Sequence, residues 1–250
     1  MSKAERDFFN ALAITGEYDV FPDAFYREIF WKIKMEHLRP GSMIIDVGSG
    51  SGAWSIRIAK RGYVVVGIDM SSKMTRNAHR FANNHQTSFS GICGDAGKLP
   101  FRDNNFDCVF FGFSLHHIPN VLQALEEAYR CLKSGGFIIL IEPNGSNPVR
   151  KLSTVIGKLL NRTRRWCFSS QSERPLSMNL IYKLLKACKF DDISAVMDYT
   201  ILKSEKANVA TDLRDHLLEI ATKLLPKQCG AVNFIIKAKR IVLNDNICCL

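Results

Sequence analysis

Short hydrophobic runs alternate with amphipathic stretches along most of the first 145 residues of the chain. The mostly apolar runs at 43–47 and 106–111, each with a single aspartate, are typical of strands that are buried on both faces of a parallel sheet. Strands are expected near 43–47, 63–68, 87–92, 106–111 and 136–141, with helices between them. This alternation predicts the α/β class, with a doubly wound and mostly parallel sheet.

The pattern is less regular after Pro143. It predicts helices near 148–160, 176–188 and 207–224, and two further strands near 191–198 and 231–239. The expected sheet therefore has seven strands.

The first 40 residues lack strand-like alternation and are rich in aromatic residues. We expect them to form helices that cover one end of the sheet as a lid. Two interpretations of the aromatic side chains stay open: they pack the lid onto the sheet, or some of them face a substrate. Tyr18 is the preferred substrate-facing residue.

A glycine-rich turn follows the first expected strand. It holds Gly48, Gly50 and Gly52 at alternate positions, with Ser49 between the first two. Glycine permits positive φ and lets a ligand approach the main chain, and the helix expected at 53–60 presents unpaired N–H groups there. The same residues also suit a plain strand-to-helix turn, so the turn alone does not identify a ligand.

Acidic residues stand at the ends of the first three expected strands: Asp46, Asp69 and Asp95. Asp46 is placed to reach a cationic ammonium, directly or through water. Asp69 is placed to accept hydrogen bonds from both hydroxyls of a ribose, as in dinucleotide-binding folds. Met70 offers an apolar surface to an adenine ring, while Asp95 and the amide of Ala96 suit its polar edge. The three strand ends thus predict a site for an adenosine-containing cofactor.

Several motifs over residues 40–145 together resemble the class I S-adenosylmethionine-dependent methyltransferases. The resemblance is closest to small-molecule enzymes such as those of ubiquinone and menaquinone biosynthesis. The motifs are DVGSGSG at 46–52, GID at 67–69, GDAGKLPF at 94–101, NFDCVFFGFSLHHIPN at 105–120 and EAYRCLKSGGFIILIEPN at 127–144.

The resemblance implies a Rossmann-like seven-stranded sheet with an antiparallel last strand. It also implies that S-adenosyl-L-methionine is the cofactor and S-adenosyl-L-homocysteine the product. The glycine turn would hold the methionine part, Asp69 would bind the ribose, and Asp95 with Ala96 would bind the adenine. Gly112, after the fourth strand, is a further candidate for contact with the cofactor. Motifs typical of adenine N-methyltransferases and RNA cytosine C5-methyltransferases are absent, which disfavours methylation of nucleic-acid bases.

Methyl transfer from a sulfonium is an in-line displacement, so the protein mainly aligns donor and acceptor, and a catalytic base is optional. His116 and His117 follow the fourth strand, beside the region where open α/β sheets bind ligands. Either is a candidate base, and His116 is the candidate placed toward the substrate. The alternative interpretation is that the pair only caps a helix or packs under the loop.

Positive charge is concentrated in one segment of a chain whose net charge is +10. Residues 143–172 hold six Arg or Lys and no Asp or Glu, and the 150–165 stretch has the periodicity of a basic amphipathic helix. Such a helix is either a lid with solvated charges or a contact for an anionic membrane surface, an acidic substrate or nucleic-acid phosphate. A nucleic-acid or protein methyltransferase, and a non-catalytic or NAD-type nucleotide-binding protein, therefore remain as alternative functions.

Length and composition fit one globular domain, since 46% of the 250 residues are hydrophobic and 23% are charged. We divide it into a helical lid (1–40), a cofactor-binding core (41–145), a basic helical cap (146–190) and C-terminal strands with a helix (191–250). The eight cysteines have no metal-ligand spacing, so no metal is expected. The charged first residues and the absence of a long apolar run predict a cytoplasmic protein without a transmembrane segment.

Overall fold

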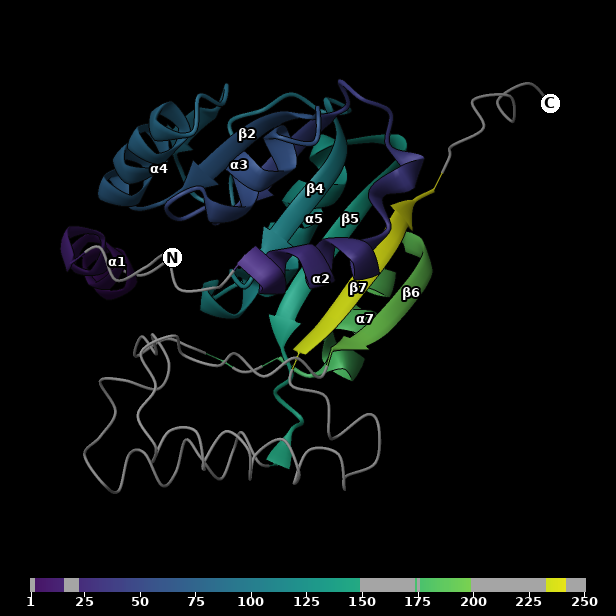
Figure 1. The fold of residues 1–250 in the computed structure, drawn as a ribbon. Helices are drawn as coiled ribbons and strands as arrows, with labels where there is room; N and C mark the ends of the chain where they lie inside the picture. Colours follow the sequence, from purple (N-terminus) through teal and green to yellow (C-terminus); the bar gives the residue numbers. More distant parts are fainter. Residues whose placement is uncertain (1–2, 16–22, 149–173, 175, 199–232, 242–250) are drawn as a thin grey trace.

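The computed structural model describes residues 3–15, 23–148, 174, 176–198 and 233–241, and these residues form an open α/β sheet with helices on both faces (Figure 1). The strand order is β3-β2-β1-β4-β5-β7-β6. The strands are β1 (Met43–Val47), β2 (Val64–Asp69), β3 (Ser90–Cys93), β4 (Phe106–Gly112), β5 (Leu132–Pro143), β6 (Phe190–Asp198) and β7 (Asn233–Arg240).

The sheet is parallel from β3 to β5, and β7 runs antiparallel to both β5 and β6. The predicted fold class is therefore confirmed, including the antiparallel last strand. The strand order reverses direction between β1 and β4, and such a switch point is where open α/β sheets bind ligands.

Alternate residues of β1 explain why both faces of the sheet need helices. Ile44 belongs to a core shared with α2 (Asp23–Ile33) and α3 (Ala53–Ala59), whereas Ile45 belongs to a core shared with α5 (Val121–Cys131) and α7 (Met178–Ala187). In Figure 1, α2 and α3 lie in front of the sheet, and α5 and α7 lie behind it. Successive side chains of a strand point to opposite faces, so the apolar run of β1 fills both cores.

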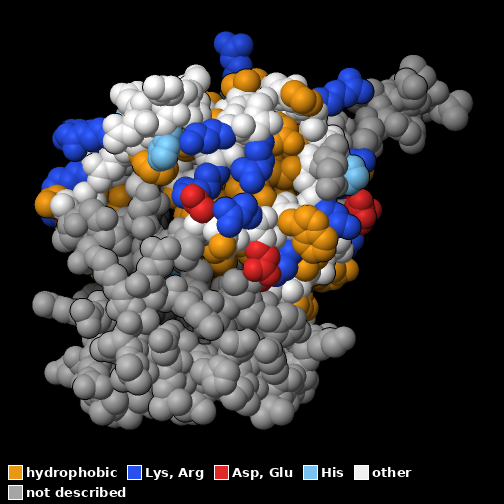
Figure 2. All heavy atoms as spheres, viewed as in Figure 1, with side chains coloured by type: hydrophobic (Ala, Val, Ile, Leu, Met, Phe, Trp, Pro, Cys, Tyr) orange, Lys and Arg blue, Asp and Glu red, His pale blue; other side chains and the backbone are white. Residues whose placement is uncertain are grey.

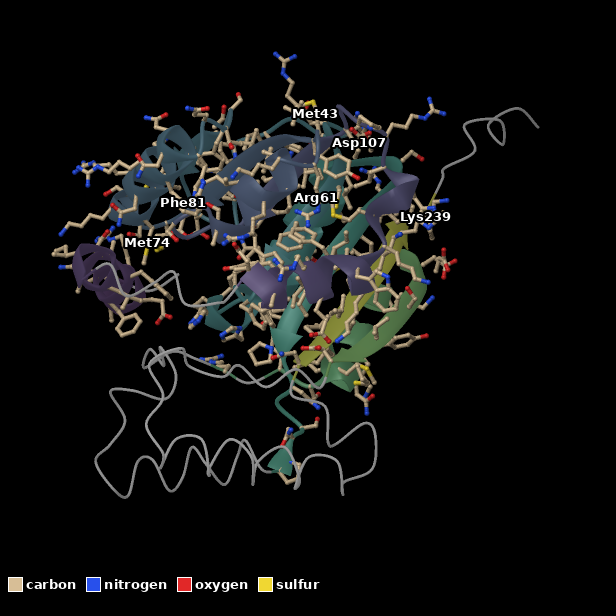
Figure 3. The ribbon with its side chains drawn as sticks, in the orientation of Figure 1. Met43, Arg61, Met74, Phe81, Asp107 and Lys239 are labelled. Carbon is tan, nitrogen blue, oxygen red and sulfur yellow. The ribbon has the colours of Figure 1, made fainter. Side chains whose placement is uncertain are left out.

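Helix α1 (Lys3–Thr15) lies beside α4 (Ser72–Asn84) near the carboxyl ends of β1 and β2 (Figure 1). Asn10 accepts a hydrogen bond of 2.7 Å from Ser71 Oγ, and Asn77 Nδ2 donates to the carbonyl of Ala13, also at 2.7 Å. Met74 of α4, labelled next to α1 in Figure 3, is fully buried. The first helix is thus attached to the end of the sheet where a cofactor was predicted.

The opposite end of the sheet has its own polar anchor. The amide of Met43 donates to Asp107 Oδ2 at 2.8 Å, and both residues are labelled in Figure 3, far from α1. Lys133 pairs with the other oxygen of Asp107 at 2.8 Å. These contacts join the starts of β1, β4 and β5, so they support the sheet without taking part in the candidate site.

The aromatic residues of the second helix pack inward. Phe25, Tyr26 and Phe30 are buried, and their rings contact the indole of Trp54. The packing interpretation is therefore confirmed for these three residues. Trp31 differs from them, since 77% of it is exposed. Tyr18, the helices expected near 148–160 and 207–224, and the basic 150–165 stretch lie outside the described residues.

Candidate functional site

The glycine turn after β1 has the backbone geometry that the sequence predicts. Gly48, Gly50 and Gly52 have φ values of +73°, +53° and +84°. A Cβ at Gly48 would lie 2.4 Å from the Cβ of Ser114, whose hydroxyl donates to the carbonyl of Val47 at 2.6 Å. The turn is therefore pressed against the segment that follows β4, and the first glycine is required by that packing.

The amides of the turn are held by β2. Gly48 N and Ser49 N both donate to the carbonyl of Ile68, at 2.8 and 3.1 Å. Gly50 N donates to Asp69 Oδ2 at 2.9 Å. The sequence predicts that such amides contact a ligand directly, whereas here three of them fix the turn onto the neighbouring strand end.

Ser51 supplies a polar atom of a different kind. Its Oγ is one of two buried side-chain polar atoms without a hydrogen-bond partner in the part of the chain that the structure describes. A buried hydroxyl without a partner costs free energy, so a bound polar ligand at this turn would satisfy it.

Asp69 is the charged centre of the site. One oxygen of its carboxylate accepts from Gly50 N, and the other accepts from Ser71 N at 2.8 Å. Burial raises the pKa of this carboxyl, and the two amides partly offset the increase. Each oxygen retains a second lone pair, so the carboxylate can still accept hydrogen bonds from ribose hydroxyls.

Asp46 lies deeper than the sequence analysis expects. Only 1% of the residue is exposed, and Oδ2 accepts a hydrogen bond of 2.6 Å from Ser55 Oγ at the start of α3. Burial raises the pKa of Asp46 to about 7, and the nearby charge of Asp69 adds to this increase. The carboxyl thus connects the end of β1 to the first turn of α3.

We expect Asp46→Asn to make stability less dependent on pH. Because the pKa of Asp46 is about 7 in the folded protein and 3.8 in the reference state, the folded chain binds more protons between these values. Wild-type stability should therefore fall as pH rises from about 4 to 7, by up to a few kcal/mol. Urea titrations at pH 5 and pH 8 measure the difference, with Ser55→Ala as a variant that keeps the carboxyl. An equally steep loss in Asp46→Asn would contradict this assignment.

A cleft opens where the ends of β1, β2, β3 and β4 meet α1. The space between its walls is about 510 Å³, with open solvent at its mouth included. Of the predicted residues, the cleft is lined by Gly48, Asp69, Met70, Ala96 and His117. Ser114, Ile118, Arg6 and Phe9 also line it, and the last two come from α1.

Two predicted residues have neighbours that give them another role in this structure. Asp95 Oδ1 accepts from Gly97 N at 2.8 Å, which shapes the loop behind Ala96. A Cβ at Gly112 would lie 2.6 Å from Cδ1 of Trp54. Like Asp46, Ser49, Gly50, Gly52 and His116, these two residues are not part of the cleft lining. A cofactor would therefore have to extend beyond the cleft to contact Asp95 or Gly112.

The two adjacent histidines have different acidic partners. His116 Nδ1 lies 2.6 Å from Glu142 Oε2, and Glu142 Oε1 accepts from the amides of Ser114 and Leu115 at 3.2 and 2.8 Å. Glu142 is completely buried at the end of β5. Glu142 was not predicted as a site residue, although an acid that follows the apolar run 137–141 was a signal for it.

His117 is joined to the first helix. Its Nδ1 lies 3.0 Å from Glu5 Oε1, and both residues are buried. The ring of Phe9 packs edge-on against the imidazole, with 5.1 Å between ring centroids. Glu5 and Arg6 were not predicted from the sequence, because nothing local in the first helix indicates which of its charged residues lie at the cleft.

Comparison with known proteins supports a methyltransferase domain. Residues 45–140 match the family described as "Methyltransferase domain". Demethylmenaquinone methyltransferase of Staphylococcus haemolyticus is 34% identical over 137 residues, which are 52% of this chain and 57% of the relative. The chain thus spans little more than half the length of that relative.

Solved structures show the same fold. The YcgJ protein of Bacillus subtilis superposes with a TM-score of 0.65 at 18% identity, covering 86% of this chain and 99% of that one. Phosphoethanolamine N-methyltransferase 2 of Haemonchus contortus, solved with S-adenosyl-L-methionine, gives a TM-score of 0.63 at 16% identity and covers 86% of this chain and 51% of that one. Residues 45–140 therefore match the methyltransferase-domain family, and the described sheet has the fold of these solved structures.

Proposed function

We propose that the protein transfers the methyl group of S-adenosyl-L-methionine to an O, N or C atom of a small molecule and releases S-adenosyl-L-homocysteine. The observation that carries the proposal is Asp69, a carboxylate on the wall of the cleft that is fixed by the amides of Gly50 and Ser71. A fixed carboxylate at the end of the second strand is the ribose acceptor of nucleoside-binding α/β folds.

The residues around Asp69 fit the rest of the cofactor. Met70, Ala96 and Ile118 give the cleft an apolar wall suited to adenine, while Asp95 is the candidate acceptor for its amino group. The glycine turn, with the buried hydroxyl of Ser51, is the candidate site for the methionine part. When bound, the cofactor supplies an electrophilic methyl carbon.

The protein contributes position and enclosure. Helix α1 places Arg6 and Phe9 on the cleft wall and is tied to Ser71, two residues after Asp69. A helix over the cleft excludes water and holds the acceptor in line with the methyl carbon. Tyr18, proposed as a substrate contact, lies outside the described residues.

The matched relative named demethylmenaquinone methyltransferase favours a small-molecule acceptor over a polymer. Contact with an anionic partner through the 150–165 segment remains a proposal, because that segment lies outside the described residues. Lys and Arg side chains do outnumber Asp and Glu on the face shown in Figure 2. No helix among the described residues is long and apolar enough to cross a membrane.

We include a cytoplasmic location in the proposal. The described cysteines Cys93, Cys108, Cys131 and Cys188 are all thiols, which is typical of proteins in a reducing compartment. Burial raises the pKa of Cys131 and Cys188 to about 11, so these two thiols are poorly reactive.

The test of the proposal is a direct comparison of cofactors. We expect calorimetric titration of the full chain to give micromolar binding of S-adenosyl-L-homocysteine and no heat with NAD. Methyl uptake from labelled S-adenosyl-L-methionine would then be measured with phenols, quinone precursors, amines, thiols and fatty acids. Binding of NAD without S-adenosyl-L-homocysteine would refute the proposed function, and methylation of RNA in preference to all small molecules would replace it with the polymer alternative.

A further inference from the structure

We propose that Glu5 is a positioning residue, which orients His117 to take a proton from the acceptor molecule during methyl transfer. The inference rests on the proposed methyltransferase function and deepens it. It also names the class of acceptor: a molecule whose methylated atom carries an ionisable proton, such as a phenolic hydroxyl.

The contact between Glu5 and His117 joins two distant parts of the chain at the cleft. The carboxylate and the imidazole nitrogen Nδ1 lie 3.0 Å apart, and both residues are buried, with Glu5 only 1% exposed. His117 and two further residues of α1, Arg6 and Phe9, line the cleft beside Asp69. Burying a carboxylate and an imidazole costs free energy. Such a pair beside the cleft is therefore better explained by a role in the reaction than by packing alone.

The pairing decides the proton positions on the imidazole. An ionised carboxylate only accepts hydrogen bonds, so Nδ1 carries the proton and Nε2 is the basic nitrogen. The carboxylate also stabilises the imidazolium that forms when Nε2 takes a second proton. Orientation of a histidine base by a carboxylate on its other nitrogen is the arrangement of serine hydrolase triads.

His116 is also paired with a carboxylate, but this pair holds the loop after β4 in place. Its partner Glu142 uses the other carboxylate oxygen to hold the amides of Ser114 and Leu115, so this pair fixes the chain after β4. His116 is not part of the cleft lining, whereas His117 is. The centroids of the two imidazole rings lie 4.1 Å apart, so His116 supports the position of His117.

The chemical step balances without another reactant. The acceptor oxygen forms a bond to the methyl carbon, the S–CH₃ bond breaks, and its electron pair stays on sulfur as a neutral thioether. The proton of the acceptor hydroxyl passes to Nε2 of His117 and later to solvent. An acceptor that has no proton to lose, such as a tertiary amine, gains nothing from this arrangement.

The first test measures the pair without any acceptor. Among the described residues, the charged or titratable groups that pair with His117, line the cleft with it or contact its neighbour His116 are Glu5 and Arg6 from α1, Asp69 from the end of β2, Glu142, Arg174 and His116 itself. In Glu5→Gln the imidazolium loses its carboxylate, so we expect the titration midpoint of His117, followed by histidine NMR, to fall by about 0.5 pH unit or more. Glu28→Gln is the matched control, because Glu28 is paired with Lys32 on the surface of α2. An unchanged midpoint in Glu5→Gln overturns the proposal.

The second test measures turnover with two probes, 1,4-dihydroxynaphthalene and a tertiary amine, trimethylamine. We expect wild type and Glu28→Gln to methylate the phenol, and Glu5→Gln to do so with kcat at least about tenfold lower and an unchanged KM for S-adenosyl-L-methionine. Glu5→Asp should recover part of the lost rate. Equal kcat in wild type and Glu5→Gln, or wild-type turnover of the amine alone or of neither probe, overturns the inference. Failure of S-adenosyl-L-homocysteine to bind wild type would instead refute the proposed function.

Discussion

Gly48→Ala is expected to lower the free energy of unfolding by about 3 kcal/mol and to weaken S-adenosyl-L-homocysteine binding at least tenfold. The glycine has a φ of +73°, where an alanine costs about 1–2 kcal/mol. The new Cβ would also lie 2.4 Å from the Cβ of Ser114, a clash that forces the turn and the segment after β4 apart. Overpacking of this kind costs about 1–3 kcal/mol.

Gly41→Ala is the matched control for the backbone strain alone. Gly41 has a φ of +84°, yet a Cβ added there would meet no atom within 4 Å beyond its chain neighbours. We therefore expect about 1–2 kcal/mol of destabilisation and unchanged cofactor affinity. Urea unfolding and calorimetric titration of both variants give the two quantities. Equal losses in stability and affinity for the two variants would show that the contact between Gly48 and Ser114 is unimportant.

Local patterning was sufficient to predict most of the sheet. The strands at 43–47 and 106–111 were predicted because strands buried on both faces form mostly apolar runs, here with one aspartate in each. The third strand was expected near 87–92 and is observed at Ser90–Cys93. It is the edge strand beside β2 and is only partly buried, so its apolar pattern is weak and its start was misplaced. The fifth strand begins earlier than expected, at Leu132, which pairs with Phe106 across a bulge.

The cofactor side of the cleft was more predictable than the acceptor side. Strand ends of a parallel sheet converge, so acids and glycines at those ends were placed together from sequence alone. Glu5 and Glu142 were not predicted because each pairs with a histidine far away along the chain. The sequence separation is 112 residues for Glu5 and His117, and 26 residues for Glu142 and His116. Such contacts leave no periodic pattern in the sequence, because burial of the two carboxylates depends on the tertiary packing of α1 and β5.

Asp69→Asn is expected to reduce the affinity for S-adenosyl-L-homocysteine by about 100-fold, the second of the two largest effects. Hydrogen bonds to a charged group contribute about 1.5–3 kcal/mol, and the ribose hydroxyls would lose a charged acceptor. The substitution keeps the shape of the side chain. It also removes a buried charge whose pKa is raised by burial, which offsets part of the stability lost at the amides of Gly50 and Ser71.

Affinity should therefore fall far more than stability in Asp69→Asn, the reverse of the pattern expected for a residue that only supports the fold. Calorimetric titration with S-adenosyl-L-homocysteine and urea unfolding of the same preparation separate the two effects. Asp23→Asn is the control, because Asp23 is an exposed carboxylate whose ion pair with Arg57 lies on the surface. If Asp69→Asn binds the nucleoside as tightly as wild type, the carboxylate serves only to hold the glycine turn, and the ribose contact must be assigned elsewhere in the cleft.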